Sequence, residues 1–135
     1  MNYNEALLKN ALLADLREVK NLPAKAMTEV LLLRVHYGKI AESYYAEVKK
    51  INEDADANDE AKAKAVEEKV KEEVTTPEKR MSKDAFEQIV ESAMAHQTIK
   101  SWIVVNPEAE GDERRGEIPT EQWLMNFAGN LVENY

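Results

Sequence analysis

A long amphipathic stretch from Ala24 to Ala55 constrains the fold more than any other part of the sequence. Alternate steps of three and four residues along it give a stripe that is apolar or aromatic at every position except Arg34: Met27, Val30, Arg34, Tyr37, Ala41, Tyr44, Val48, Ile51 and Ala55. This spacing is typical of a helix that packs against another helix. A second apolar line predicts that the first half of the helix is buried on more than one side: Leu31, Leu32, Leu33, Val35 and Ile40.

Beyond Tyr45 only the stripe remains apolar, so we expect the second half of this helix to project as an arm. The segment that follows Ile51 is rich in Asn and Asp, whose side chains compete for backbone hydrogen bonds and favour turns and caps. We place the turn of a helical hairpin at residues 56–59, with Asn58 or Asp59 as the cap of the return helix. A continuous helix through this acidic run is the alternative.

Signals for helix starts and ends divide the rest of the chain, which we treat as one domain. Asn4 is expected to cap the first helix, and Thr76 before Pro77 indicates a helix start, with Ser82 as a second candidate cap. If Ser82 is used, Met81 and Phe86 occupy the positions of a hydrophobic staple. The expected parts are a helical core and long helix (4–55), an acidic return helix (56–75), a core helix (76–97), a β-hairpin with a mobile loop (98–118) and a C-terminal helix (120–135).

The change in periodicity at Thr98 predicts the β-hairpin. Residues 98–105 are rich in β-branched and aromatic side chains, and residues 116–118 can return as a short antiparallel partner. Thr120 is expected to cap the last helix. The predicted fold class is mainly α, a helical bundle with a long antiparallel helical hairpin and a small C-terminal β-hairpin.

The charge of the chain argues against direct binding of nucleic acid. The formal net charge is −8, and residues 51–78 carry ten acidic and four basic side chains, whereas a phosphate backbone attracts a basic surface. The acidic surface of Asp54, Asp56, Asp59 and Glu60 is either a solvated face or the binding surface of an inhibitor. Such an inhibitor would occupy a basic nucleic-acid-binding site on a target such as a host defence nuclease.

No cysteine, secretory signal or membrane-spanning run is evident, which predicts a soluble protein of the cytoplasm. No catalytic residue, metal ligand or cofactor-binding residue is predicted. His36 and His96 lack a ligand partner at helical spacing, the serines lack an evident base, and the four glycines form no phosphate-binding loop. An enzyme of unrecognised type is the third hypothesis, after an interaction protein and an inhibitor.

Six residues are candidates for contacts with a protein partner: Arg34, Tyr37, Tyr44, Tyr45, Trp102 and Val104. Tyrosine and arginine are frequent at interface hot spots. A charge on an apolar stripe needs a carboxylate or a subunit boundary nearby, so Arg34 either pairs with Glu29, Glu73 or Glu91 or faces a partner. Tyr37 and Tyr44 have a simpler interpretation as contacts with the return helix. The strand around Trp102 can pair along its free edge with another chain.

The segment Leu22-Pro23-Ala24-Lys25, which opens a long charged helix, and the segment 117–123, which opens a short terminal one, are similar in layout to small helical proteins of unknown function encoded by bacteriophages and prophages. This resemblance implies no catalytic residues. We therefore expect a non-enzymatic protein-interaction protein, of the phage accessory or structural/assembly kind, that binds a protein partner and forms a homo-oligomer. For a phage-encoded protein, this resemblance implies a place in the host cytoplasm or in the virion. We expect no membrane partner and no direct nucleic-acid partner.

Overall fold

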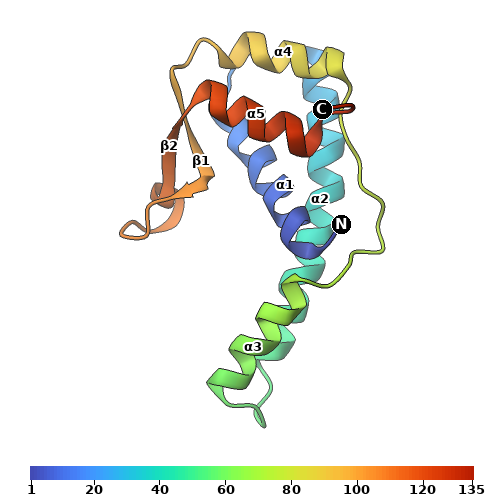
Figure 1. Cartoon of the computed structure of the whole chain (residues 1–135), viewed down its shortest axis with the longest axis vertical. Helices are drawn as coiled ribbons and strands as arrows, with labels where there is room; N and C mark the ends of the chain where they lie inside the picture. Colours follow the sequence, from blue (N-terminus) through green and yellow to red (C-terminus); the bar gives the residue numbers. More distant parts are fainter.

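A computed structural model describes residues 1–135 and confirms the mainly α-helical fold with a helical hairpin and a C-terminal β-hairpin (Figure 1). The elements are α1 (Tyr3–Asp15), a 3₁₀ turn (Leu16–Glu18), α2 (Ala24–Asn52), α3 (Asp59–Val70), α4 (Lys83–Ala93), β1 (Thr98–Val105), a second 3₁₀ turn (Gly111–Arg114), β2 (Arg115–Pro119) and α5 (Thr120–Leu131). Helix α2 runs along most of the long axis, and its last turns form an arm with α3 that projects from the body (Figure 1).

Helix α2 is buried along one face only, so the prediction of burial on more than one side is wrong. The buried face consists of Ala26, Val30, Leu33, Tyr37, Ile40, Ala41 and Tyr44. Met27, Leu31, Leu32 and Val35, in contrast, are exposed. The physical reason is that α1 and α4 both pack on the buried face, and no other element of the chain covers the opposite side.

The turn of the helical hairpin lies at residues 53–58, which excludes a continuous helix through the acidic run. Asn58 is the N-cap of α3, and its side chain accepts a hydrogen bond from the backbone N–H of Ala61 at 2.8 Å. An ion pair joins Lys69 of α3 to Glu47 of α2 at 3.8 Å. No residue of α3 is fully buried, so the arm is held by partial burial of its valines and by contacts of this kind.

Two predicted boundaries near the N-terminus and the end of α3 are wrong for a common reason. Asn2, not Asn4, is the N-cap of α1, and its side chain accepts from the N–H of Glu5 at 2.9 Å. The backbone around it pairs with the segment after α3, since the N–H of Tyr3 donates to the carbonyl of Glu72 and the N–H of Val74 donates to that of Met1. This pairing holds residues 72–74 in a non-helical conformation, so α3 ends at Val70, whereas the return helix was predicted to extend to residue 75.

Residues 75–82 are not helical, so the helix start predicted at Thr76 is wrong and the second candidate cap, Ser82, is used. Tertiary hydrogen bonds hold this segment extended. The hydroxyl of Tyr37 donates to the carbonyl of Lys79 at 2.7 Å and accepts from its N–H at 3.0 Å. The N–H of Met81 donates to the carbonyl of Leu131 at 2.7 Å. The hydrogen-bond partners of this segment lie on α2 and at the end of α5. These tertiary contacts override the local helix-start signal at Thr76 and Pro77.

The β-hairpin pairs β1 and β2 antiparallel, with Ile99 opposite Ile118 and Ser101 opposite Gly116, and an irregularity follows between Ser101 and Val105. Thr120 does not cap α5 as predicted. It is the first residue of that helix, and its hydroxyl donates to the carbonyl of His96 at 2.6 Å.

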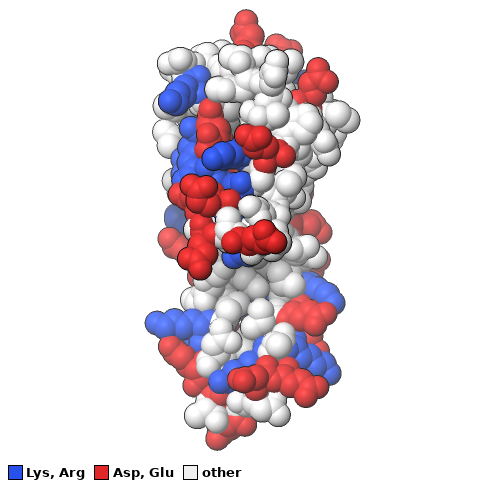
Figure 2. Space-filling model, turned by 90° about the vertical axis from the view of Figure 1, so that its left-hand side faces the viewer, with Lys and Arg blue, Asp and Glu red and all other residues white.

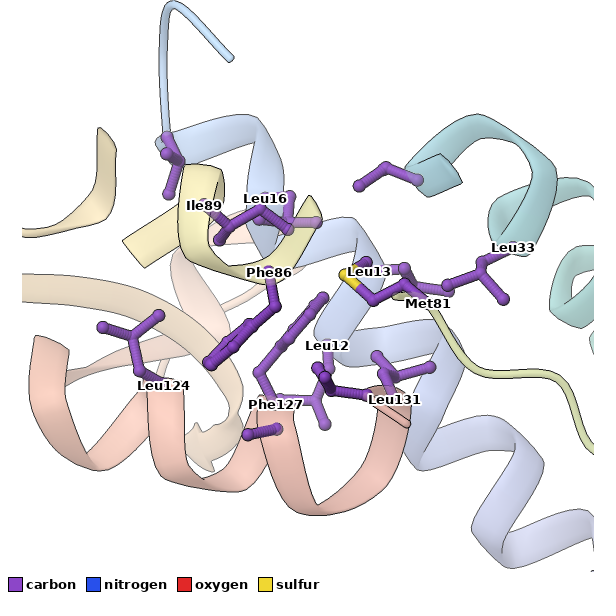
Figure 3. Packing of buried hydrophobic residues seen from close by; sticks show 14 of the residues in the cluster. Leu12, Leu13, Leu16, Leu33, Met81, Phe86, Ile89, Leu124, Phe127 and Leu131 are labelled. Atoms are coloured by element: carbon purple, nitrogen blue, oxygen red, sulfur yellow. The ribbon is translucent and has the colours of Figure 1, made fainter. Parts of the chain in front are cut away.

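The core lies where α1, α2, α4, α5 and the hairpin meet, and Figure 3 shows part of it. The rings of Phe86 from α4 and Phe127 from α5 stack with centroids 6.1 Å apart, and Trp123 lies 5.2 Å from Phe127. Met81 and Phe86, the residues predicted to flank the Ser82 cap, are both buried in this cluster.

Candidate functional site

The exposed side of α2 carries four large aliphatic side chains that the rest of the chain covers only in part. We call Met27, Leu31, Leu32 and Val35 the outer α2 surface; their exposed fractions are 45%, 54%, 66% and 57%. They lie on consecutive turns of one helix and point away from the face that α1 and α4 cover. Large contiguous apolar patches are rare on soluble monomers, which makes this surface the first candidate for binding.

Arg34 lies beside the outer α2 surface, is exposed, and has no ion-pair partner in the chain. Two of its predicted partners are engaged elsewhere. Glu29 accepts hydrogen bonds from the N–H and hydroxyl of Ser82, and Glu73 pairs with the N-terminal ammonium. Tyr45 is 60% exposed, further along the same side of α2. Arg34 and Tyr45 therefore remain available for a partner.

Tyr37 and Tyr44 do not belong to this surface, because both are buried. Tyr37 is fully enclosed and holds residue Lys79 through its hydroxyl, and burial raises the pKa of that hydroxyl. The ring of Tyr44 lies 5.5 Å from that of Tyr3 and 5.4 Å from that of Tyr45. Both tyrosines thus anchor α2 to its own chain.

The strand around Trp102 is less open than the sequence suggested. Val104 is 39% exposed, while Trp102 is half-buried with the guanidinium of Arg115 5.9 Å from its ring centroid. The N–H of Trp102 donates to the Asp15 carboxylate at 3.1 Å, and the N–H of Ile103 donates to the hydroxyl of Ser101 at 3.2 Å. These two amides are occupied, so they are not free to pair with a strand of another chain.

Asp15 is a buried carboxylate that accepts hydrogen bonds from two other elements of the fold. Its carboxylate is fully enclosed and accepts hydrogen bonds from the hydroxyl of Ser101 at 2.5 Å, the indole N–H of Trp123 at 3.1 Å and the N–H of Trp102. Burial raises the pKa of Asp15, and these hydrogen bonds partly oppose the rise. Because neither Asp15 nor Ser101 is accessible, the pair holds α1, β1 and α5 together and cannot meet a substrate.

A polar hollow of about 400 Å³ lies beside the hairpin. Basic and acidic side chains alternate around it, and two ion pairs cross it, Arg17 to Asp112 at 3.0 Å and Arg115 to Glu18 at 2.6 Å. Figure 2 shows acidic and basic side chains close together on this side of the molecule. The hollow therefore offers no surface of one charge to a ligand.

An apolar groove of about 520 Å³ lies between α4 and α5. Met94 and Met125 line it and are 50% and 76% exposed. The chain covers one end itself, since the ring of Tyr135 packs against Phe86 with centroids 5.4 Å apart and Lys83 lies over the same ring.

The acidic surface predicted from the sequence lies at the tip of the arm. Asp54, Asp56, Asp59 and Glu60 are all exposed, and none of them forms an ion pair. Basic side chains are interspersed with acidic ones over the rest of the arm, as Figure 2 shows.

Sequence reasoning missed both buried charges of α1, Lys9 and Asp15. Lys9 donates to the carbonyl of Asn130 at 2.8 Å and pairs with Glu78 at 3.4 Å, and burial lowers the pKa of its ammonium. A signal was present, because Asp15 lies three residues after Leu12 and seven after Leu8, on the apolar face of the helix. A charge at such a position needs a partner from another element.

No cluster of three or more His, Asp or Glu side chains is placed to hold a metal ion. None of the helices has the length and apolar character needed to cross a membrane. In comparisons with protein-family models, with curated proteins and with solved structures, the chain shows no significant match to any of them.

Proposed function

We propose that this protein acts by binding another protein, without catalysis, as an accessory or structural/assembly component of the phage kind. The observation that carries the proposal is the outer α2 surface, where Leu31, Leu32 and Val35 are each more than half exposed. Complete burial of one such side chain contributes about 1.5 to 3 kcal/mol. Because these side chains are already partly buried, a partner that covers them would gain roughly half of this contribution from each.

The surface is also well prepared for binding. Its helix is fixed from the opposite side by the core contacts of Val30, Leu33 and Tyr37, and by the hydrogen bonds of Tyr37 to the extended segment. A rigid helix loses little conformational entropy when a partner binds, which favours affinity. Arg34 and Tyr45 at its edge belong to the residue types that are frequent at hot spots.

Site-specific photo-crosslinking in cells that produce the protein tests the proposal. A benzophenone amino acid replaces Leu32, and a matched variant carries it at Glu91, which is exposed on α4. We expect defined protein adducts from position 32 that are absent at position 91, including adducts between copies of the chain. The absence of any adduct specific to position 32 would contradict the proposal.

A second candidate function is an acidic inhibitor that occupies a basic nucleic-acid-binding site. The supporting observation is that all four acids at the tip of the arm are exposed and unpaired: Asp54, Asp56, Asp59 and Glu60. Changing these four residues to Lys should abolish inhibition of a target nuclease and leave contacts through the outer α2 surface intact. Inhibition that survives the charge reversal would rule this function out.

A further inference from the structure

We infer that the exposed side of α2 around Gly38, which includes Leu31 of the outer α2 surface, binds a second copy of this chain in an antiparallel two-fold crossing of the two α2 helices centred on Gly38. The inference rests on the proposed function, because it names the occupant of the same surface. Three features of α2 carry it: an open glycine, two unpaired charges at equal distances from it, and apolar side chains one further turn away.

Gly38 lies inside α2, where glycine lowers helix stability relative to alanine. No turn or close contact in the chain requires it, since a Cβ at this position would meet no atom within 4 Å. At an interface the missing side chain has a use, because two helices can approach most closely where glycines face each other. A two-fold axis at this position puts Gly38 opposite Gly38 of the second copy.

Arg34 and Glu42 lie four residues before and four residues after Gly38, near the same face of the helix. Both are exposed, and neither forms an ion pair or a side-chain hydrogen bond in the chain. Eight residues separate them by roughly 12 Å along the axis, too far for a contact within one helix. The two-fold crossing brings Arg34 within reach of Glu42 of the second copy. Because the contact is symmetric, the dimer contains two such ion pairs.

The apolar side chains follow the same symmetry. Leu31 and Tyr45 lie seven residues before and after Gly38, and both are more than half exposed. In the crossing, Leu31 of each copy meets Tyr45 of the other. A crossing centred on Val35 would instead place Leu31 opposite Lys39 and leave Glu42 without a basic partner.

The antiparallel arrangement also separates the acidic arms. Residues 53–60 lie at one end of α2, so the two tips point in opposite directions and their like charges stay far apart. A contact between single helices covers less than the ~800 Å² per partner of a standard interface. We therefore expect a dissociation constant in the range of about 1 to 100 µM.

Sedimentation velocity and light scattering on the full chain, at concentrations that span the expected dissociation constant, test the inference with variants in which the charges of Arg34 and Glu42 are reversed. Arg34→Glu and Glu42→Arg should each weaken the dimer about tenfold or more, because each creates two like-charge contacts. The double variant Arg34→Glu/Glu42→Arg should restore the affinity to within about threefold. Glu91→Arg, a reversal of an exposed charge on α4, is the matched control and should change nothing.

Gly38→Leu supplies an independent measurement, because a larger side chain at the closest approach should weaken the dimer while the circular dichroism of the monomer is retained. A chain that stays monomeric throughout, or a double variant that fails to recover, overturns the inference. Failure of the proposed function has a different signature. If position 32 crosslinks to a different protein and the chain stays monomeric in solution, the proposed function stands and the second copy is excluded.

Discussion

Replacement of Asp15 by alanine should destabilise the protein by about 3 kcal/mol. The side chain accepts hydrogen bonds from the hydroxyl of Ser101, the N–H of Trp102 and the indole N–H of Trp123. The hydroxyl can rotate towards another acceptor, but the two N–H groups are fixed. A hydrogen bond to a charged group is worth about 1.5 to 3 kcal/mol, so two of them give about 3 to 6 kcal/mol. Part of this loss is offset, because the alanine variant no longer has to desolvate the Asp15 carboxylate when it folds.

The assay is urea denaturation at pH 7, followed by far-ultraviolet circular dichroism and tryptophan fluorescence. With a denaturant dependence of about 2 kcal/mol/M, the expected loss lowers the midpoint by about 1.5 M. Both tryptophans of the chain donate to Asp15, so the native fluorescence should change as well. The Asp15→Asn variant keeps one acceptor oxygen and should lose less.

Asp84→Ala is the control, since this carboxylate is exposed on α4 and pairs with Lys25 at a distance of 3.4 Å. It should cost less than about 1 kcal/mol, as is usual for surface ion pairs. If Asp15→Ala lowers the unfolding free energy no more than Asp84→Ala does, the proposal that the buried carboxylate holds α1, β1 and α5 together is refuted.

Three further predictions follow from the same structure. Because burial raises the native pKa of Asp15 above its unfolded value, the part of the unfolding free energy that depends on protonation of Asp15 should be greatest below the ordinary pKa of an aspartate and decrease as pH rises through the native pKa. The difference in unfolding free energy between wild type and Asp15→Asn, measured from pH 3 upwards, should therefore fall towards its value at pH 7, and a rise would contradict the sign. Gly116→Ala should destabilise the protein by about 1 to 3 kcal/mol, because the added Cβ would lie 2.6 Å from the carbonyl oxygen of Val104. Gly129→Ala is the contrasting variant: its Cβ would meet no atom within 4 Å, so it should stabilise α5 by about 0.5 kcal/mol in the same urea assay. Tyr37→Phe should cost about 1 to 2 kcal/mol because the carbonyl and N–H of Lys79 both lose a partner, and an unchanged midpoint would show that water replaces the hydroxyl.

Helix positions were largely predictable because they depend on short-range periodicity and side-chain chemistry. The spacing of Val30, Tyr37, Ala41 and Tyr44 marks the buried face of α2, although Met27 and Arg34 of the same predicted stripe are exposed. The cluster of Asn and Asp after Ile51 marks the turn of the hairpin, and Asn58 was one of two candidates for its cap. These features need no knowledge of distant residues.

Boundaries set by distant residues were not predictable. Thr76 and Pro77 form a good local start signal, but the backbone there is held extended by contacts with α2, among them the ring Nε2 of His36, 2.8 Å from the carbonyl oxygen of Pro77. The cap at Asn2 likewise depends on pairing with Glu72 and Val74, which lie far away in the sequence. Sequence alone cannot show which of several local signals survives such tertiary contacts.

The second apolar line of α2 led to a wrong prediction of burial in an informative way. Apolar residues on two sides of a helix indicate that both sides are covered, but a sequence does not say whether the cover belongs to the same chain. Here α3 and the last turns of α2 form the arm, so only α1, α4, α5 and the hairpin remain for the body, and none of them covers Leu31, Leu32 and Val35. The pattern that predicted a second buried face is thus consistent with cover from another molecule. If a second copy supplies it, folding and association are linked, and the unfolding midpoint should rise with protein concentration by mass action.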